Sequence, residues 1–76
     1  MNFKELPSPI PNSRTWGALE AKKGYVIFED EGKFTASYRR VDMGVKTVTV
    51  YIIDYADRVD TFEEAVLACE QADKEQ

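Results

Sequence analysis

The sequence contains no histidine and a single cysteine, Cys69, among its 76 residues. Histidine is the commonest metal ligand and the usual general base near neutral pH, so most acid–base, nucleophilic and zinc chemistry lacks its normal centre here. One cysteine cannot form an internal disulfide bond. Because Cys69 falls on an apolar stripe at helical spacing and precedes Glu70, we expect a small core residue rather than a reactive thiolate.

Long apolar runs and glycine-rich loops are also missing. A transmembrane helix needs about 18 consecutive apolar residues, and no such run is present. The N-terminal residues have no apolar segment of the length typical of a signal peptide. The four glycines are scattered and form no phosphate-binding loop. These absences predict a cytoplasmic protein that has no membrane segment and no cofactor.

The acidic residues show one regular spacing, in which Asp54, Asp57 and Asp60 recur at every third position. Calcium loops place oxygen ligands at alternate positions and require a glycine, and this segment has neither feature. Hydrolases that use paired carboxylates hold two acids across a cleft, for which so small a domain has little room. We therefore predict no metal site, no catalytic residues and a protein that is not an enzyme.

Charge is divided unevenly along the chain, whose net charge is −4. Residues 1–40 carry seven basic and five acidic side chains, whereas residues 41–76 carry three basic and nine acidic ones. Binding to nucleic acid depends mainly on cations that release counterions from phosphates, so a net-acidic chain starts at a disadvantage. An acidic C-terminal segment is typical of a solvated helix that keeps a small protein in solution.

Prolines dominate the first segment, residues 1–12. A proline fixes its own φ and favours extended backbone in the residue before it, so this segment is predicted to be an extended arm. The remaining residues, 13–76, form one small domain. Three apolar side chains give the arm something to bury, and we expect part of it to pack on the domain: Phe3, Leu6 and Ile10.

Residues 13–23 fit either a short helix or a strand. A helix with Ser13 as its N-cap would place Trp16 on its buried stripe, although Gly17 in its interior would cost about 1 kcal/mol relative to alanine. A strand over residues 15–21 is the alternative. We favour the helix.

Three strand patterns follow. Residues 25–29 are rich in β-favouring side chains, and residues 30–33 read Asp-Glu-Gly-Lys, a tight hairpin signal with glycine where φ becomes positive. Residues 33–40 alternate with period two. After a turn at residues 42–44, residues 47–53 form the strongest strand pattern of the chain. The order predicts a three-stranded antiparallel sheet.

The third predicted strand is apolar on both faces. One face carries the aliphatic side chains of Val48, Val50 and Ile52. Tyr51 and Ile53 belong to the other face. A sheet that is apolar on both faces needs a cover on each side, and one helix covers only one. We expect the C-terminal helix to cover the valine face, and Trp16 and Leu19 to pack against Tyr51 or Ile53 on the back, within one chain or across a dimer interface.

An amphipathic helix over residues 61–74 ends the pattern. Thr61 with Glu64 fits a capping box, and Asp60 with Glu63 fits one residue earlier. The buried stripe consists of Phe62, Ala65, Val66, Cys69 and Ala72. The predicted fold is therefore α+β: a three-stranded antiparallel sheet in β-β-β-α order, one C-terminal amphipathic helix on one face, and an N-terminal extended arm plus a short helix or strand.

These features favour a non-enzymatic protein-interaction module, an adaptor or inhibitor that binds another protein or itself. The predicted sheet carries more apolar surface than its helix covers, and an exposed apolar patch usually marks an interaction site. Small accessory proteins of bacteria and their phages often have this composition. The residues predicted to bind the partner are Trp16, Arg39, Tyr51, Ile53 and Tyr55.

A nucleic-acid-binding domain is the alternative. Hydroxyl groups and cations gather on one face of the strand over residues 33–40, and side chains of these types contact phosphates. The residues predicted to bind nucleic acid are Lys33, Arg39, Arg40 and Lys46.

Overall fold

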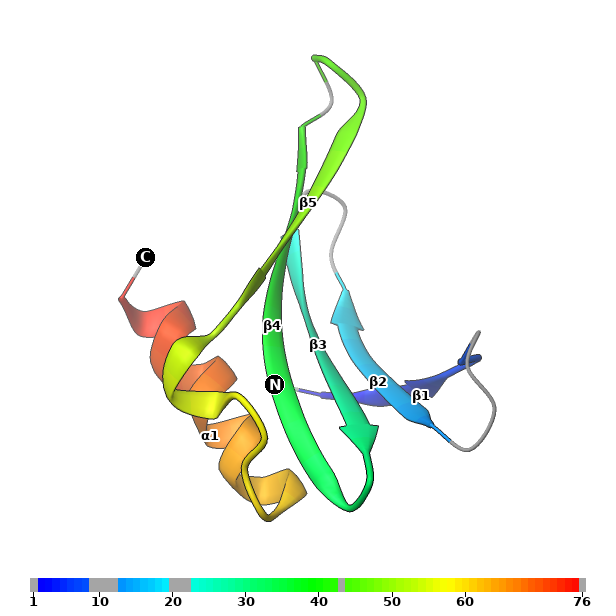
Figure 1. The fold of residues 1–76 in the computed structure, drawn as a ribbon. Coiled ribbons are helices and arrows are strands. Elements are labelled where there is room, and N and C mark those ends of the chain that lie inside the picture. Colours follow the sequence, from blue (N-terminus) through cyan, green and yellow to red (C-terminus); the bar gives the residue numbers. More distant parts are fainter. Residues whose placement is uncertain (1, 9–12, 20–22, 43, 76) are drawn as a thin grey trace.

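The structure is a computed structural model that describes residues 2–8, 13–19, 23–42 and 44–75. Five strands form one antiparallel sheet in sequence order, and a short 3-10 helix and an α-helix follow (Figure 1). The strands are β1 (Lys4–Leu6), β2 (Arg14–Leu19), β3 (Lys23–Asp30), β4 (Lys33–Asp42) and β5 (Thr47–Ile52). The helices are η1 (Asp54–Ala56) and α1 (Phe62–Lys74). The α+β class is as predicted, but the three-stranded sheet is wrong, because β1 and β2 add two strands.

β2 takes the place of the helix favoured for residues 13–23. Its side chains alternate between the two faces of the sheet. Trp16 lies toward α1, with its ring centroid 5.9 Å from that of Phe34 and 4.9 Å from that of Phe62. Gly17 faces the other way beneath Leu6, where an added Cβ would come within 2.6 Å of the Leu6 Cδ1 atom. Glycine at this position therefore leaves room for the Leu6 side chain, which would have to shift if residue 17 carried a Cβ.

β1 lies within the predicted arm. It pairs with residues 15–17 of β2 and forms one edge of the sheet. Just before it, Phe3 packs edge-on against Phe62, with ring centroids 6.1 Å apart. Part of the arm thus packs on the domain, as expected. The other predictions for the arm, at Pro9, Ile10 and Pro11, concern residues outside those that the structure describes.

Helix α1 packs across β3 and β4 on one face of the sheet (Figure 1). Its N-cap is Thr61, as predicted: the Thr61 hydroxyl accepts a hydrogen bond from the backbone N–H of Glu64 at 3.2 Å. Asp60 instead bonds Lys33 through its carboxylate. Cys69 is fully buried on the apolar stripe. The core lies between α1 and the sheet and consists of Tyr25, Ile27, Ala36, Ile53, Ala56, Ala65, Ala68 and Cys69.

The two faces of β5 are the reverse of the prediction. Ile53 follows β5 and is 8% exposed in the core beneath α1, and Tyr51 stacks on Tyr38 on the same face. The valine face predicted to lie under the helix is open, with exposed fractions of 56%, 53% and 55% for Val48, Val50 and Ile52. Leu19 shares this open face, so its predicted packing on Tyr51 or Ile53 is also wrong. Alternation groups the residues of a strand correctly, but it does not say which group the helix covers.

Within the described residues, no helix has the length and hydropathy needed to cross a membrane.

The connection from β5 to α1 is bound to β4 by hydrogen bonds. Phe34 and Val59 exchange backbone hydrogen bonds of 2.8 and 2.7 Å, and the Thr35 hydroxyl accepts a hydrogen bond from the N–H of Arg58 at 3.1 Å. The segment after β5 therefore covers the first half of β4, which β5 itself leaves unpaired.

We expect Trp16→Ala to reduce the free energy of unfolding by about 3 kcal/mol or more, because it removes a half-buried ring that contacts Phe34 and Phe62. Urea denaturation followed by circular dichroism would measure the change. Leu67→Ala is the control, because Leu67 is 64% exposed on α1 and should cost no more than about 0.5 kcal/mol. Equal effects of the two substitutions would contradict a core centred on the aromatic rings.

Candidate functional site

The two edges of the sheet differ in length and in chemistry. β1 has three residues, carries Lys4 and Glu5, and is followed by Pro7. β5 has six residues, all of them exposed, and contains no charged residue, proline or glycine. Natural sheets protect an edge by short length, charge and proline, because an open edge pairs readily with another strand. β1 has these protections and β5 has none of them.

The backbone of β5 offers a row of hydrogen-bonding groups on its outer side. The N–H of Ile53 donates to the carbonyl of Ala36, its partner in the continued register of β4 and β5. Alternate residues of an antiparallel strand bond to the same neighbour, so Thr49 and Tyr51 also direct their backbone groups toward β4. The N–H and C=O groups of the residues between them point to the open side; these residues are Val48, Val50 and Ile52.

The same three residues form an apolar row on the face opposite α1, which we call the β5 row: Val48, Val50 and Ile52. Val41 of β4 lies directly opposite Val48 and widens the apolar surface at this end of the row. At the other end, Ile52 and the exposed Phe28 line a hollow of about 360 Å³. The edge therefore presents unpaired backbone groups and apolar side chains together.

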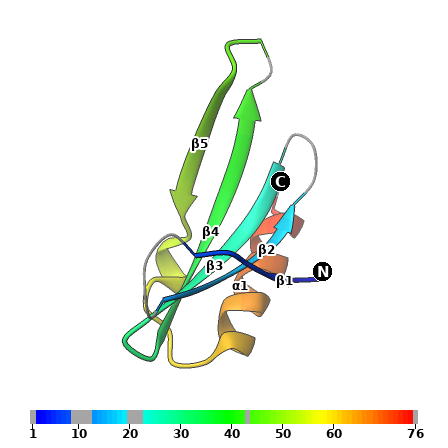
Figure 2. The same cartoon turned by 90° about the vertical axis from the view of Figure 1, so that its right-hand side faces the viewer.

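The β4–β5 hairpin spans residues 37–52, and its tip projects beyond the end of β3. β3 pairs with β4 only as far as Arg40, and beyond it β4 pairs with β5 alone. Figure 2, in which α1 lies behind the sheet, shows the two strands rising together with β5 on the outside. Asp42 closes the hairpin: its carboxylate accepts hydrogen bonds from the N–H groups of Gly44 and Val45. The described turn residues are 44–46, whereas Met43, at the centre of the turn predicted at residues 42–44, lies outside the described residues.

Three of the four cations predicted to bind nucleic acid lie on this hairpin. Arg39 faces away from α1 opposite Val50, Arg40 lies opposite Thr49, and Lys46 is in the turn. In the part of the chain that the structure describes, none of the three forms an ion pair. Lys33 is separated from them by most of the length of β4, about 23 Å, and is paired with Asp60.

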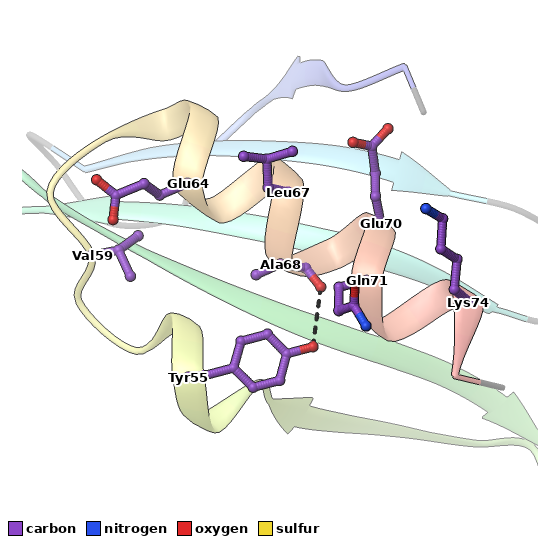
Figure 3. Close-up of a pocket in the computed structure, with 8 residues that line it drawn as sticks. All are labelled: Tyr55, Val59, Glu64, Leu67, Ala68, Glu70, Gln71 and Lys74. Carbon is purple, nitrogen blue, oxygen red and sulfur yellow. Dashed lines mark hydrogen bonds between the residues drawn. The ribbon is translucent and has the colours of Figure 1, made fainter.

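A second hollow, of about 420 Å³, lies between η1 and α1 (Figure 3). The Tyr55 hydroxyl donates to the carbonyl of Ala68 at 3.4 Å and holds the aromatic ring against the helix. Leu67 is exposed at the rim. The polar groups around it are surface side chains, namely Glu64, Glu70, Gln71 and Lys74. The apolar wall of the hollow is formed by Tyr55, Val59, Leu67 and Ala68.

The structure brings only some of the predicted partner-binding residues together. Arg39 and Tyr51 both lie beside Val50, on opposite faces of the hairpin. Tyr55 lies apart from them, at the second hollow. Ile53 is in the core, and Trp16 is half-buried beneath α1. The prediction missed the β5 row itself, although the run of uncharged residues from 47 to 53 is visible in the sequence.

The metal-binding and thiol chemistry of the described residues is limited. In the described ranges, no group of three histidine, cysteine or acidic side chains converges closely enough to hold a metal ion. Burial, together with the charge of Glu70, raises the pKa of the Cys69 thiol to about 12. At neutral pH the thiol is therefore protonated and enclosed. Comparison of the chain with protein-family models, curated proteins and solved structures finds no match.

Two buried groups predict loss of stability at alkaline pH. Burial raises the pKa of Cys69 from 9.0 and that of Tyr25 from 10.0, each to about 12. Because the folded state holds both protons more tightly than the unfolded state, their contribution to stability is complete below pH 9. We expect it to be lost as the pH rises from 9 to 12. Urea denaturation at a series of pH values would measure the decline.

Cys69→Ala and Tyr25→Phe are the matched variants for this experiment, since neither new side chain titrates. Each should show a shallower decline of the free energy of unfolding between pH 9 and 12 than the native chain. If both variants decline as steeply as the native chain, burial of these two groups is not the cause.

Proposed function

We propose that this protein is a non-enzymatic protein-interaction module that binds an extended strand along the open edge of β5. The observation that carries the proposal is the coincidence, on one strand, of outward backbone groups and an exposed apolar row at Val48, Val50 and Ile52. An added strand would satisfy the backbone groups and cover the side chains at the same time. This is β-augmentation, in which main-chain hydrogen bonds give affinity and side chains give specificity.

The remainder of the surface supports an edge rather than a pocket as the binding element. Both hollows are open at the surface, and the one between η1 and α1 is ringed by ordinary solvated side chains. The hairpin, in contrast, leaves three aliphatic side chains more than half exposed. A contiguous exposed apolar surface of this kind usually marks an interaction site. Arg39 and Tyr51 flank Val50 and would contact the side chains of the bound strand on either face.

Val50→Lys should abolish binding, because it places a charge at the centre of the edge in the way that natural proteins protect exposed strands. The native chain would be used to recover bound proteins from a lysate of its source organism, and the recovery repeated with the variant. Leu67→Lys is the control, since Leu67 has a comparable exposure on α1, away from the edge. We expect the partner to be lost with Val50→Lys alone.

The control also defines the contradicting results. A partner retained by Val50→Lys, or lost equally with Leu67→Lys, would place binding away from β5. Circular dichroism should show both variants to be folded, because each replaces an exposed side chain.

Nucleic-acid binding is a second candidate, favoured by one observation: among the described residues, Arg39, Arg40 and Lys46 lie without an ion pair on or beside the two-stranded tip of the β4–β5 hairpin. Ribbons of this kind fit the major groove of duplex DNA. The net charge of −4 argues against nucleic-acid binding, because a negatively charged chain is repelled by phosphates.

A titration of labelled duplex and single-stranded DNA at two salt concentrations separates the two functions. Three phosphate contacts would give a slope of log affinity against log salt of about −3 for duplex DNA, and an Arg40→Gln variant would reduce that slope by about one. If the protein is a protein-interaction module, we expect no binding that depends on salt in this way.

A further inference from the structure

We infer that the strand bound at the edge of β5 is β5 of a second copy of this chain, paired antiparallel about a two-fold axis at Val50. The inference rests on the proposed function and names the partner of the same edge. Four observations lead to it: the backbone register, the side-chain pattern, the distribution of charge and the protection of the opposite edge.

The backbone of β5 is complementary to itself in this arrangement. With the axis at Val50, this residue lies opposite Val50 of the second copy, and Val48 lies opposite Ile52 of the second copy. These are the residues whose N–H and C=O groups point to the open side. Opposed residues of a hydrogen-bonded antiparallel pair exchange both bonds, so every outward group of the β5 row finds a partner.

The side chains also match. On the face away from α1, the β5 rows of the two copies meet and form one aliphatic strip of six side chains. On the other face, Tyr51 lies opposite Thr49 of the second copy. Aliphatic pairs and aromatic–β-branched pairs stabilise antiparallel strands, whereas like charges placed opposite one another destabilise them. No charged residue occurs in Thr47–Ile52, so no such repulsion arises.

The charge of the whole chain does not prevent this pairing. Most carboxylates of the C-terminal half lie in residues 54–75, outside β5. The charged residues nearest to the axis at Val50 are Arg39 and Arg40 on β4, one strand inward. Between the two copies they would be three strand spacings apart, about 14 Å, which exceeds the Debye length of about 8 Å at physiological salt. A charged partner strand, by contrast, would meet no charge on β5 to select it.

The other edge explains why assembly would stop at two copies. In the paired form the two sheets become one ten-stranded sheet whose outer edges are both β1. β1 is three residues long, and its Glu5 forms an ion pair with Arg14. A short charged edge resists further pairing, so the interface closes as a symmetric dimer rather than extending into a fibre. Since six paired residues give a small interface, we expect a dissociation constant in the micromolar range or weaker.

Disulfide cross-linking tests the register directly, using the full chain. In Val50→Cys the two new thiols lie on opposed residues with Cα atoms about 5.5 Å apart, within the range that a disulfide spans. Val48→Cys is the matched control, on the same strand and face with similar exposure. Its two copies would lie about 13 Å apart, too far for a disulfide. The native Cys69 is buried and should not react.

We expect mild oxidation to produce a covalent dimer from Val50→Cys and not from Val48→Cys, whereas an equal mixture of Val48→Cys and Ile52→Cys chains should again cross-link. Sedimentation equilibrium of the native chain should show a dimer that dissociates on dilution. Equal cross-linking of Val48→Cys and Val50→Cys would overturn the register. A native chain that stays monomeric at millimolar concentration, with no Val50→Cys dimer, would overturn self-pairing.

The proposed function fails on a different result. A monomeric chain whose protein partner is lost in Val50→Lys and kept in Leu67→Lys would refute the second copy as the occupant, while β5 would remain an interaction edge. Retention of the partner by Val50→Lys would refute the edge itself.

Discussion

Phe62, the first residue of α1, contacts the rings of Phe3, Trp16 and Phe34, with centroid separations of 6.1, 4.9 and 6.0 Å. These rings come from the segment before β1, from β2 and from β4. One side chain therefore joins the N-terminal part of the chain, the middle of the sheet and the helix. In a chain of 76 residues with little surface to bury, such a cluster of large rings supplies much of the apolar burial on which the fold depends.

The position of this cluster decides what the helix can cover. α1 has 13 residues, lies across β3 and β4, and reaches β5 only where Ile53 enters the core. Tyr25, Tyr38 and Tyr51 continue the aromatic contacts across three strands on the same face, with successive ring centroids 5.4 and 6.1 Å apart. On the opposite face of the hairpin, Val48, Val50 and Ile52 stay more than half exposed. The exposure of the β5 row is thus a consequence of where the single helix is anchored.

Local signals were enough to predict α1, the hairpin between β3 and β4, and β5. The Thr61 cap and the glycine of the hairpin are features of neighbouring residues, and the structure has Gly32 at φ 79° as the turn requires. β2 could not be decided in this way, because Arg14–Leu19 fits two secondary structures. The contacts that select the strand, from Trp16 to Phe34 and Phe62, involve residues far along the chain.

The candidate site was predictable only in part, for a related reason. A period of two showed that Val48, Val50 and Ile52 share a face, but the docking of the connection after β5 determines that Ile53 is buried and they are not. The lack of charge in residues 47–53 was equally visible. It acquires meaning only when β5 is known to be the last strand of the sheet, since an uncharged central strand is ordinary.

The strands pair strictly in sequence order, which has a consequence for how the chain folds during synthesis. Each hairpin can form as soon as its second strand is available, because its contacts are local. The contact between Phe3 and Phe62, in contrast, waits for α1, which follows the whole sheet in the sequence. Until α1 leaves the ribosome, the nascent chain exposes the aromatic face of its sheet together with the uncharged β5 edge. Both surfaces favour aggregation while they are exposed, so the order of synthesis makes this interval the one in which the chain is most prone to aggregate.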